Sequence, residues 1–368
     1  MTSQAPIRFT DFGNVTVAED EAAMRRVLSS GQLVLGDEVL QFERGWADRC
    51  GVQYAIGVGN GLDAIEIGLR SVGIGPGDEV ITTPMTAVAT VLGILRAGAV
   101  PVLADIEPST ALISLPSVAR CLTPRTKAVV LVHLYGQMRD LPKWVDFCQA
   151  HDLLLIEDCA QAHDAKYGHK VAGAWGVFGA YSFYPTKNLG ALGDGGALVT
   201  NEFTVDDTAR SLRNYGQRTR YVHDRLGLNS RLDELQAATL NGRLPSLAGW
   251  TNRRQQIADI YRAGIRSGHV NLLASPEEDE NHVYHLFVVT SDHRDELQNY
   301  LLDEGVETLI HYPVPAHRQA PLDHLARDPS GLANSEHHAA SCLSLPCRPT
   351  LSDEQTGLVI DAINSFRP

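Results

Sequence analysis

Apolar segments of two kinds alternate along the middle of the chain. Short runs that are apolar throughout predict buried strands, and longer segments with apolar residues on one face predict helices. The expected helices and strands, in chain order, cover residues 61–71, 79–83, 86–97, 99–104, 117–122, 126–133, 141–151 and 153–156. Repeated strand–helix units of this kind build a mostly parallel sheet with helices on both faces.

Beyond residue 196 the alternation gives way to two long helical segments at residues 231–247 and 251–266. A strand, a helix, a second strand and a closing helix are then expected at residues 284–290, 294–304, 306–311 and 351–365. The two long helices carry the chain out of the repeated units. We therefore expect a large domain over residues 1–245 and a small α+β domain over residues 246–368.

The charge balance excludes some classes of partner. The 368 residues include 31 Lys and Arg against 44 Asp and Glu, a net charge of −13. Binding to nucleic acid or to a membrane surface needs basic patches, so we expect neither. An anionic substrate must instead be held by local donors. Apolar runs stay well short of the roughly 20 residues that cross a bilayer.

The cysteines and the N-terminus indicate a cytoplasmic protein. The six cysteines are scattered and form no Cys-x-x-Cys pair, which favours reduced, buried thiols. The first residues contain no long apolar core of the kind found in secretory signals.

Lys187 is the most informative residue of the chain. It follows the aromatic run Ala180–Tyr184 and precedes the glycine-rich segment Gly190–Gly196. A lysine at a strand end among aromatic side chains loses hydration, which disfavours the ammonium form. The neutral amine is a nucleophile that can form a Schiff base with a carbonyl. A lone lysine in a loop is otherwise a solvated surface charge.

A second cluster strengthens this interpretation. Residues 152–158 predict a short buried strand that ends in Glu157 and Asp158. A carboxylate at the end of a parallel strand faces the crevice where α/β proteins bind ligands. Pyridoxal phosphate needs such a carboxylate to keep its ring nitrogen protonated. Alone, either carboxylate could cap a helix or bind a metal. Together with Lys187, about 30 residues later, Asp158 favours the cofactor site.

With these motifs the chain resembles the DegT/DnrJ/EryC1/StrS sugar aminotransferases, which are fold-type I pyridoxal phosphate enzymes. The resemblance spans nearly the whole chain. Its further motifs are Gly31–Gly36, Tyr54–Ala64, Gly77–Val80, Val132–Gly136, Asn229–Ala237 and His311–His317. The resemblance implies a large domain with a mostly parallel seven-stranded sheet flanked by helices, followed by the smaller domain.

The resemblance also implies roles for individual residues. Lys187 would hold pyridoxal phosphate and, once released, move protons as the cofactor passes to pyridoxamine phosphate. A dehydratase branch of the family has histidine in place of this lysine, so lysine favours transamination. Asp158 would face the ring nitrogen and Gln161 the ring oxygen. His163 would lie against the ring or touch the substrate, although a buried structural histidine is an equal alternative.

The phosphate is expected at the start of the first predicted helix. Free N–H groups at a helix N-terminus bind anions, here those of Gly61 and Leu62. The spacing of Gly57, Gly59 and Gly61 does not fit the dinucleotide motif Gly-x-Gly-x-x-Gly. Many relatives have threonine at the position of Leu62, so this chain lacks one phosphate hydrogen bond. The resemblance assigns a further phosphate contact to Ser182.

Two positions bear on the assembly and on the cofactor ring. The resemblance gives Asn229 to the neighbouring subunit's site, which implies a homodimer with shared sites. Many relatives have an aromatic residue, stacked on the ring, where this chain has Ala87.

Candidate substrate contacts are Tyr184, His311, Tyr312 and His317. The combined motifs look most like members that aminate C3 of a 3-keto-6-deoxy nucleotide sugar, a dTDP-sugar, with glutamate as amino donor. The alternatives are amination at C4, a keto-cyclitol substrate, or a non-catalytic regulator that keeps the fold.

Overall fold

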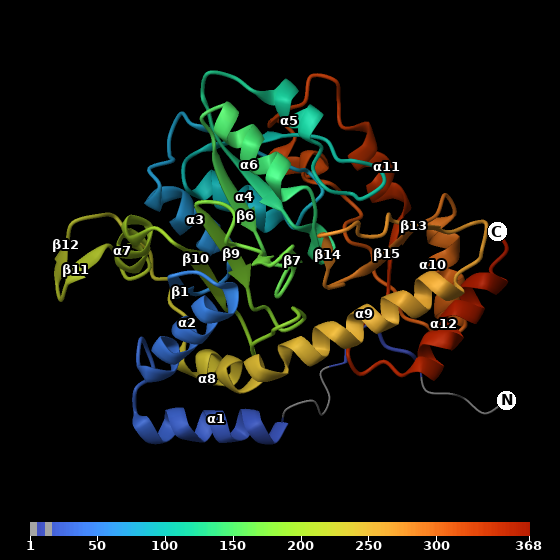
Figure 1. The fold of residues 1–368 in the computed structure, drawn as a ribbon, viewed down its shortest axis with the longest axis horizontal. Helices are drawn as coiled ribbons and strands as arrows, with labels where there is room; N and C mark the ends of the chain where they lie inside the picture. The colour runs from blue at the N-terminus through green and yellow to red at the C-terminus, as the bar shows by residue number, and fades with distance from the viewer. Residues whose placement is uncertain (1–5, 12–16) are drawn as a thin grey trace.

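The computed structural model describes residues 6–11 and 17–368. Its centre is an eight-stranded sheet (Figure 1). In spatial order the strands are β1 (Tyr54–Val58), β10 (Gly196–Thr200), β9 (Phe178–Ser182), β6 (Leu154–Asp158), β4 (Thr126–Val132), β2 (Glu79–Thr82), β3 (Val100–Leu103) and β16 (Ala326–Arg327). Strand β10 is antiparallel to both neighbours, whereas every pair from β9 to β16 is parallel. The expected mostly parallel α/β sheet is confirmed.

The sheet has one strand more than the seven expected. The additional strand, β16, comes from the C-terminal part of the chain and pairs Ala326 with Val102 and Arg327 with Leu103. It covers N–H and C=O groups that β3 would otherwise leave unpaired at the edge of the sheet. Two residues are too few to produce an apolar alternation, so the sequence did not predict this strand.

Helices cover both faces of the sheet. On β4, Val129 and Leu131 point to one face, whereas Ala128 and Val130 point to the other, as the two-residue period of a strand requires. The first face is covered by α2 (Asp37–Cys50), α5 (Leu115–Cys121), α6 (Leu141–Ala150) and α8 (Glu234–Arg243). The second is covered by α3 (Gly61–Ser71), α4 (Val88–Arg96) and α7 (Phe203–Leu212).

Helix α3 is held close to β9. Asn60 caps the helix, and its side-chain oxygen accepts a hydrogen bond from the N–H of Asp63 at 2.9 Å. A Cβ at Gly68 would lie 2.2 Å from the ring of Phe178, so only glycine allows this approach. The start of α3 consequently lies beside the end of β9.

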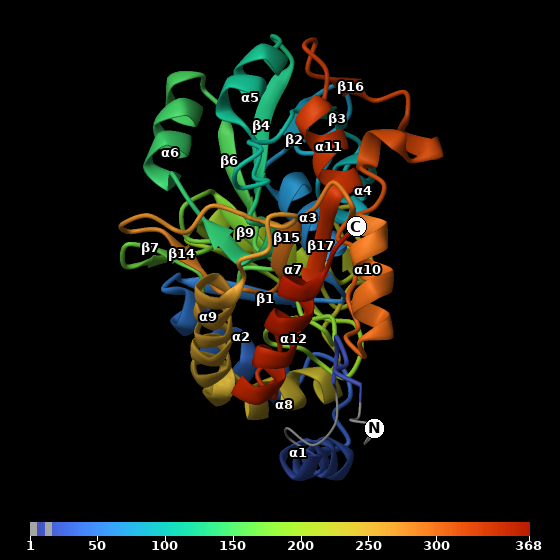
Figure 2. The same cartoon turned by 90° about the vertical axis from the view of Figure 1, so that its right-hand side faces the viewer.

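A second core lies in the C-terminal part of the chain. The strands β13 (Asn271–Leu272), β15 (Phe287–Thr290) and β17 (Cys342–Leu345) form a sheet. Three helices accompany it, namely α9 (Leu247–Gly264), α10 (Arg294–Asp303) and α12 (Asp353–Ser365) (Figure 2). The apolar side chains of this core include Ile257, Tyr261, Phe287, Leu343 and Ile363.

The expected helices near residue 245 exist, with different limits. Helices α8 and α9 are separated by a short 3-10 turn over Leu244–Ser246. Pro245 has no N–H to continue α8, which accounts for the break. The division into two domains remains a prediction, because β16 and β14 (Asn281–His282) return to the large sheet and to β5 (Gln137–Met138).

The strand expected at residues 306–311 is wrong. Val306 forms an isolated bridge with Ile7, and Leu309 forms another with Ser344. The segment changes partners between these two residues, so its apolar pattern produces bridges without a continuous strand.

The remaining elements lie outside the two cores. Helix α1 (Val17–Ser30) packs Ala23 and Val27 against Ala238 of α8 (Figure 1). The others are the hairpins β7–β8 (Lys166–Tyr167, Lys170–Val171) and β11–β12 (Gln217–Thr219, Val222–His223), with helix α11 (Ala333–Ser341). Within the described part of the chain, the helices are too short or too polar to cross a membrane.

Candidate active site

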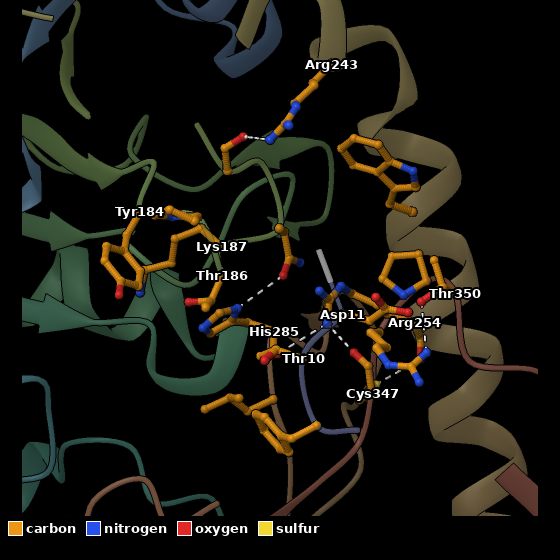
Figure 3. Close-up of a pocket in the computed structure, with 18 of the residues that line it drawn as sticks. Thr10, Asp11, Tyr184, Thr186, Lys187, Arg243, Arg254, His285, Cys347 and Thr350 are labelled. Carbon is orange, nitrogen blue, oxygen red and sulfur yellow. Dashed lines mark hydrogen bonds between the residues drawn. The ribbon is translucent and has the colours of Figure 1, made fainter. Parts of the chain in front are cut away.

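Lys187 lies on the turn that follows β9. Its backbone N–H donates to the carbonyl of Tyr184 at 2.8 Å, which closes the turn. The half-buried side chain lines a cavity of about 610 Å³ (Figure 3). Burial lowers the pKa of the amine to about 8, and the negative charge of Asp158 opposes this shift. About a tenth of the amine is then neutral at pH 7.

Asp158 ends the neighbouring strand β6. The strands β6 and β9 are parallel, and Asp158 pairs with Ala180, so both site segments leave the same edge of the sheet. One carboxylate oxygen accepts a hydrogen bond from the hydroxyl of Thr90 at 2.7 Å, and the other accepts from the N–H of Ala160 at 3.1 Å. These two hydrogen bonds fix the orientation of the carboxylate.

Thr90 comes from α4 and was not expected in the site. Its hydroxyl also lies 2.7 Å from that of Thr86. Since Thr90 donates to Asp158, the hydroxyl of Thr86 donates to Thr90, and the two threonines form a chain that ends on the carboxylate. Thr86 lies just before α4 and Thr90 lies in its first turn, and nothing in the local sequence indicated that Asp158 is their partner.

The side-chain amide of Gln161 is held at both ends. Its oxygen accepts from the N–H of Tyr135 at 2.6 Å, and its nitrogen donates to the hydroxyl of Tyr312 at 3.1 Å. Burial, followed by the charge of Asp158, raises the pKa of Tyr312 to about 12, so its hydroxyl stays protonated. The fold thus joins Gln161 to a residue 151 positions later.

Glu157 has a structural role. It accepts from His133 Nε2 at 2.9 Å and from the backbone N–H groups of Gly173, Trp175 and Gly176. Burial alone would raise its pKa, but these hydrogen bonds hold the pKa below its ordinary value. His133, Glu157 and Cys159 have metal-ligating atoms close together. Because the donors already occupy the carboxylate, this group is better explained as buried support for β6.

The expected phosphate contacts lie together. The first regular hydrogen bond of α3 is from the N–H of Ala64 to the carbonyl of Asn60, so the N–H groups of Gly61 and Leu62 precede it. A Cβ at Gly61 would lie 2.8 Å from the Cβ of Ser182. The end of β9 and the start of α3 therefore lie in contact at Ser182 and Gly61.

The expected substrate contacts separate into different places. Tyr184 and His311 line the cavity together with Lys187. Burial, followed by the charge of Lys187, lowers the pKa of His311 to about 4. Tyr312 bonds to Gln161, as described above. His317 is buried, and its Nε2 lies 3.0 Å from Glu336. Like Asp158 and Gln161, it is not among the residues that line this cavity.

His163 lies in an aromatic cluster behind the site. Its ring centroid is 5.5 Å from those of Tyr181 and Phe183 and 5.6 Å from that of Trp46. The residue is 0% exposed, so it presents no surface to a bound molecule. Burial, with the charge of Lys187 second, lowers its pKa to about 3. This placement favours the structural alternative for His163.

Asn229 is exposed and is not among the residues that line the cavity. It pairs in an isolated bridge with Asn214. The adjacent Ser230 is buried, and its hydroxyl donates to Asp63 at 2.6 Å and accepts from the N–H of Gly59 at 2.9 Å. The segment is thereby anchored at the start of α3, with Asn229 facing outward.

Two further residues lining the cavity were not predicted. His285 precedes β15, and its Nδ1 lies 3.2 Å from the side-chain oxygen of Asn188. Arg254 lies on α9 on the opposite side of the cavity from Lys187 (Figure 3). Asn188 directly follows Lys187, which could have indicated that Asn188 lies at the site. His285 and Arg254 lie far along the chain, so the local sequence gave no such signal for them.

Comparison with known proteins gives a match over almost the whole chain. The profile of the DegT/DnrJ/EryC1/StrS aminotransferase family matches residues 15–364. A Streptomyces venezuelae protein named dTDP-3-amino-3,4,6-trideoxy-alpha-D-glucose transaminase is 42% identical over 349 residues, which are 95% of this chain and 92% of the relative.

Two more similarities bear on function and fold. A Geobacillus stearothermophilus protein named pleiotropic regulatory protein is 42% identical over 342 residues, which are 92% of each chain. The crystal structure of S. venezuelae DesV in complex with a ketimine intermediate superposes with a TM-score of 0.94 at 40% identity and covers 98% of both chains.

Proposed function

This chain belongs to the DegT/DnrJ/EryC1/StrS aminotransferase family and is a pyridoxal phosphate-dependent aminotransferase, and we propose that it aminates C3 of a 3-keto-6-deoxy nucleotide sugar. The nucleotide is dTDP and the amino donor is glutamate. The observation that carries this proposal is Lys187 on the wall of the cavity, with Asp158 close enough to influence its pKa.

The residues present fit the cofactor. The cradle of Gly61, Leu62 and Ser182 suits its phosphate, because helix N-termini bind anions and the glycine permits close approach. Asp158 suits a protonated ring nitrogen, since Thr90 and Ala160 fix the position of its carboxylate at the end of β6. When bound, pyridoxal phosphate supplies an electron sink that stabilises the negative charge left on a substrate carbon after loss of a proton.

Lys187 has two duties in the proposed reaction. It would hold the cofactor through its neutral amine, which its lowered pKa makes available near neutral pH. As a free amine, Lys187 Nζ would take a proton from one carbon and return it to another. Gln161, fixed by Tyr135 and Tyr312, would bind the ring oxygen.

The choice of substrate is supported by relatives. The S. venezuelae relative is named for a dTDP-3-amino sugar. An Aneurinibacillus thermoaerophilus protein, 42% identical over 348 residues, carries the name dTDP-3-amino-3,6-dideoxy-alpha-D-galactopyranose transaminase. Both names share the C3 amine and the dTDP group. Tyr184 and His311 are the cavity residues that we propose contact the sugar.

We propose a cytoplasmic homodimer in which Asn229 completes the phosphate site of the partner. The outward position of Asn229 beside the anchored Ser230 supports this arrangement. The six free, buried cysteines suit a reducing compartment.

A regulatory function is the second candidate, because one relative is named a pleiotropic regulatory protein. Amination at C4 and a keto-cyclitol substrate remain alternatives within the same chemistry.

The test is to load the protein with pyridoxamine phosphate, add 3-keto and 4-keto nucleotide sugars separately, and follow the absorbance of the lysine-bound cofactor. We expect its return with the 3-keto sugar. Return with the 4-keto sugar alone moves the assignment to C4, and no return with either nucleotide sugar favours a keto-cyclitol substrate or the regulator.

A further inference from the structure

One wall of the cavity carries a buried cation without a carboxylate partner. Arg254 is 8% exposed. Its Nη1 donates to the backbone carbonyls of Tyr284 and His285, each at 3.3 Å, and to that of Cys347. Within residues 6–11 and 17–368, no carboxylate forms an ion pair with its guanidinium. Carbonyl dipoles only partly compensate a buried charge.

The free side of this guanidinium is well defined. A guanidinium has five N–H donors, and those on Nη1 face the three carbonyls. Nε is buried and has no partner among the described residues. Nη2 likewise makes no hydrogen bond to the described residues, and Arg254 lines the cavity. The Nε–Nη2 edge of Arg254 is therefore the edge that an oxyanion can complete, since carboxylates and phosphates bind guanidinium in this paired manner.

The other arginines of the cavity differ. Arg243 bonds to the carboxylate of Asp20 and to the carbonyl of Gly190. Arg348 bonds to the carbonyl of Arg8 and to the hydroxyl of Thr350, with the charge of Asp11 nearby. Among the residues that the structure describes, no carboxylate pairs with Arg254 and none contributes to the shift of its pKa.

We propose that the Nε–Nη2 edge of Arg254 binds an oxyanion of a reactant, either the carboxylate of the amino donor or the phosphate of the nucleotide sugar. The inference rests on the proposed function, which requires both reactants. Arg254 contacts the backbone of His285, and the same cavity is lined by His285 and Lys187. A reactant held by Arg254 therefore shares the cavity with the reacting lysine. With a net charge of −13, the protein needs such a local cation to hold an anion.

The direct test uses calorimetric titration of the holoenzyme with glutarate, its uncharged diamide glutaramide, and pyrophosphate. Glutarate has no amine, so it binds without reacting. We expect glutarate to bind at least about tenfold more tightly than glutaramide, or pyrophosphate to bind measurably, because only the oxyanions gain a paired charge-assisted contact. Arg254→Lys and Arg254→Met should abolish this binding advantage. Folded variants that bind both oxyanions like the wild type contradict the proposal.

The half-reactions distinguish the two sources of the oxyanion. If Arg254 holds the donor, Arg254→Lys raises the KM for glutamate about tenfold or more and leaves the KM for the keto sugar unchanged. If it holds the nucleotide, the reverse occurs. Equal losses of kcat in both half-reactions, with both KM values unchanged, indicate a purely structural arginine and overturn the proposal.

A matched control lies on the same helix. Arg262 bonds to the carbonyl of Leu273 and to the hydroxyl of Tyr284, outside the cavity lining, so Arg262→Met tests the loss of a helix arginine alone. We expect unchanged oxyanion binding in this variant.

If both Arg254 variants fail to fold, a crystal structure of the wild type with glutarate or pyrophosphate decides. An oxygen within hydrogen-bonding distance of Nη2 supports the proposal, and an anion bound elsewhere refutes it. The binding of glutarate or pyrophosphate does not require turnover. A protein that binds them through Arg254 but does not transaminate would therefore contradict the proposed function and leave the role of Arg254 in place.

Discussion

The side-chain oxygen of Asn188 accepts a hydrogen bond from Nδ1 of His285 at 3.2 Å. The orientation of the amide is fixed, because its nitrogen donates to the carbonyl of Val283 at 3.2 Å. An oxygen can only accept, so Nδ1 of His285 carries the proton. Burial, with the charge of Lys187 second, lowers the pKa of His285 well below its ordinary value. The ring is therefore neutral, and Nε2 is an acceptor on a residue that lines the cavity.

This relationship predicts a fixed tautomer for His285. Nitrogen NMR of the labelled protein should show Nδ1 protonated and no titration of His285 between pH 5.5 and about 8. Asn188→Asp replaces the amide with a carboxylate, which stabilises the imidazolium and should raise the pKa of His285. Titration of His285 near its ordinary pKa in the unmodified protein contradicts the assignment.

The buried histidines predict loss of stability in acid. The pKa values of His163, His282, His285, His311 and His338 are all lowered, chiefly by burial. Below about pH 6.5 the unfolded chain takes up protons at these histidines while the folded chain does not, so the free energy of unfolding falls as pH falls. Each fully buried histidine contributes up to about 1.4 kcal/mol per pH unit. Urea unfolding at pH 7 and pH 5.5 measures this loss. Equal free energies at the two pH values contradict it.

The lowered pKa of Lys187 predicts how the cofactor is captured. The apoprotein should bind pyridoxal phosphate covalently at a rate that rises about tenfold per pH unit up to pH 8 and then levels off. Asp158→Asn removes the charge that opposes the shift, so the pKa of Lys187 should fall further and the plateau should begin at lower pH. The pKa of Lys187 is lower in the folded chain than in the unfolded chain, so folding disfavours the ammonium form. Below about pH 8 the lysine is charged in both states, and its cost to the free energy of unfolding is then largest. Lys187→Ala should abolish both capture and turnover. A rate that keeps rising to pH 10 contradicts the assignment.

Thr90 is predicted to support Asp158. Thr90→Val keeps the shape of the side chain but removes the donor to the carboxylate, which costs about 1.5–3 kcal/mol for a hydrogen bond to a charged group. We expect kcat to fall roughly tenfold or more, while Thr90→Ser, which retains the hydroxyl, restores most of it. Single-turnover kinetics with glutamate measure the effect. Equal kcat values for Thr90→Val and the wild type remove Thr90 from the site.

Mixed dimers test the shared site. One subunit carries Lys187→Ala and the other carries Asn229→Ala. If Asn229 serves the partner's site, one site of this dimer contains both defects and the other contains none, so about half of wild-type activity remains. If Asn229 serves its own subunit, the activity falls to half of that of the Asn229→Ala homodimer. Purification with two different affinity tags isolates the mixed species.

The local sequence determined the elements that carry the chemistry. The uniform apolar run before Asp158 and the aromatic run before Lys187 each predicted a strand end, and the structure places both at one edge of the parallel sheet. The glycines before α3 likewise predicted a helix start. These features depend on neighbouring residues, because strand periodicity and helix capping are local properties.

The tertiary structure alone decided which distant residues meet. It placed Tyr312 on Gln161 and Thr90 on Asp158, and it left His317 outside the cavity lining. The broken strand at residues 306–311 and the extra strand β16 have the same origin, since both depend on partners far along the chain. Arg254 shows the limit most clearly. Its sequence position on a helix predicts a solvated arginine, whereas packing of α9 against the carbonyls of Tyr284 and Cys347 buries the charge beside the cavity. Burial and unpaired charge arise from contacts between elements, so no local pattern of residues encodes them.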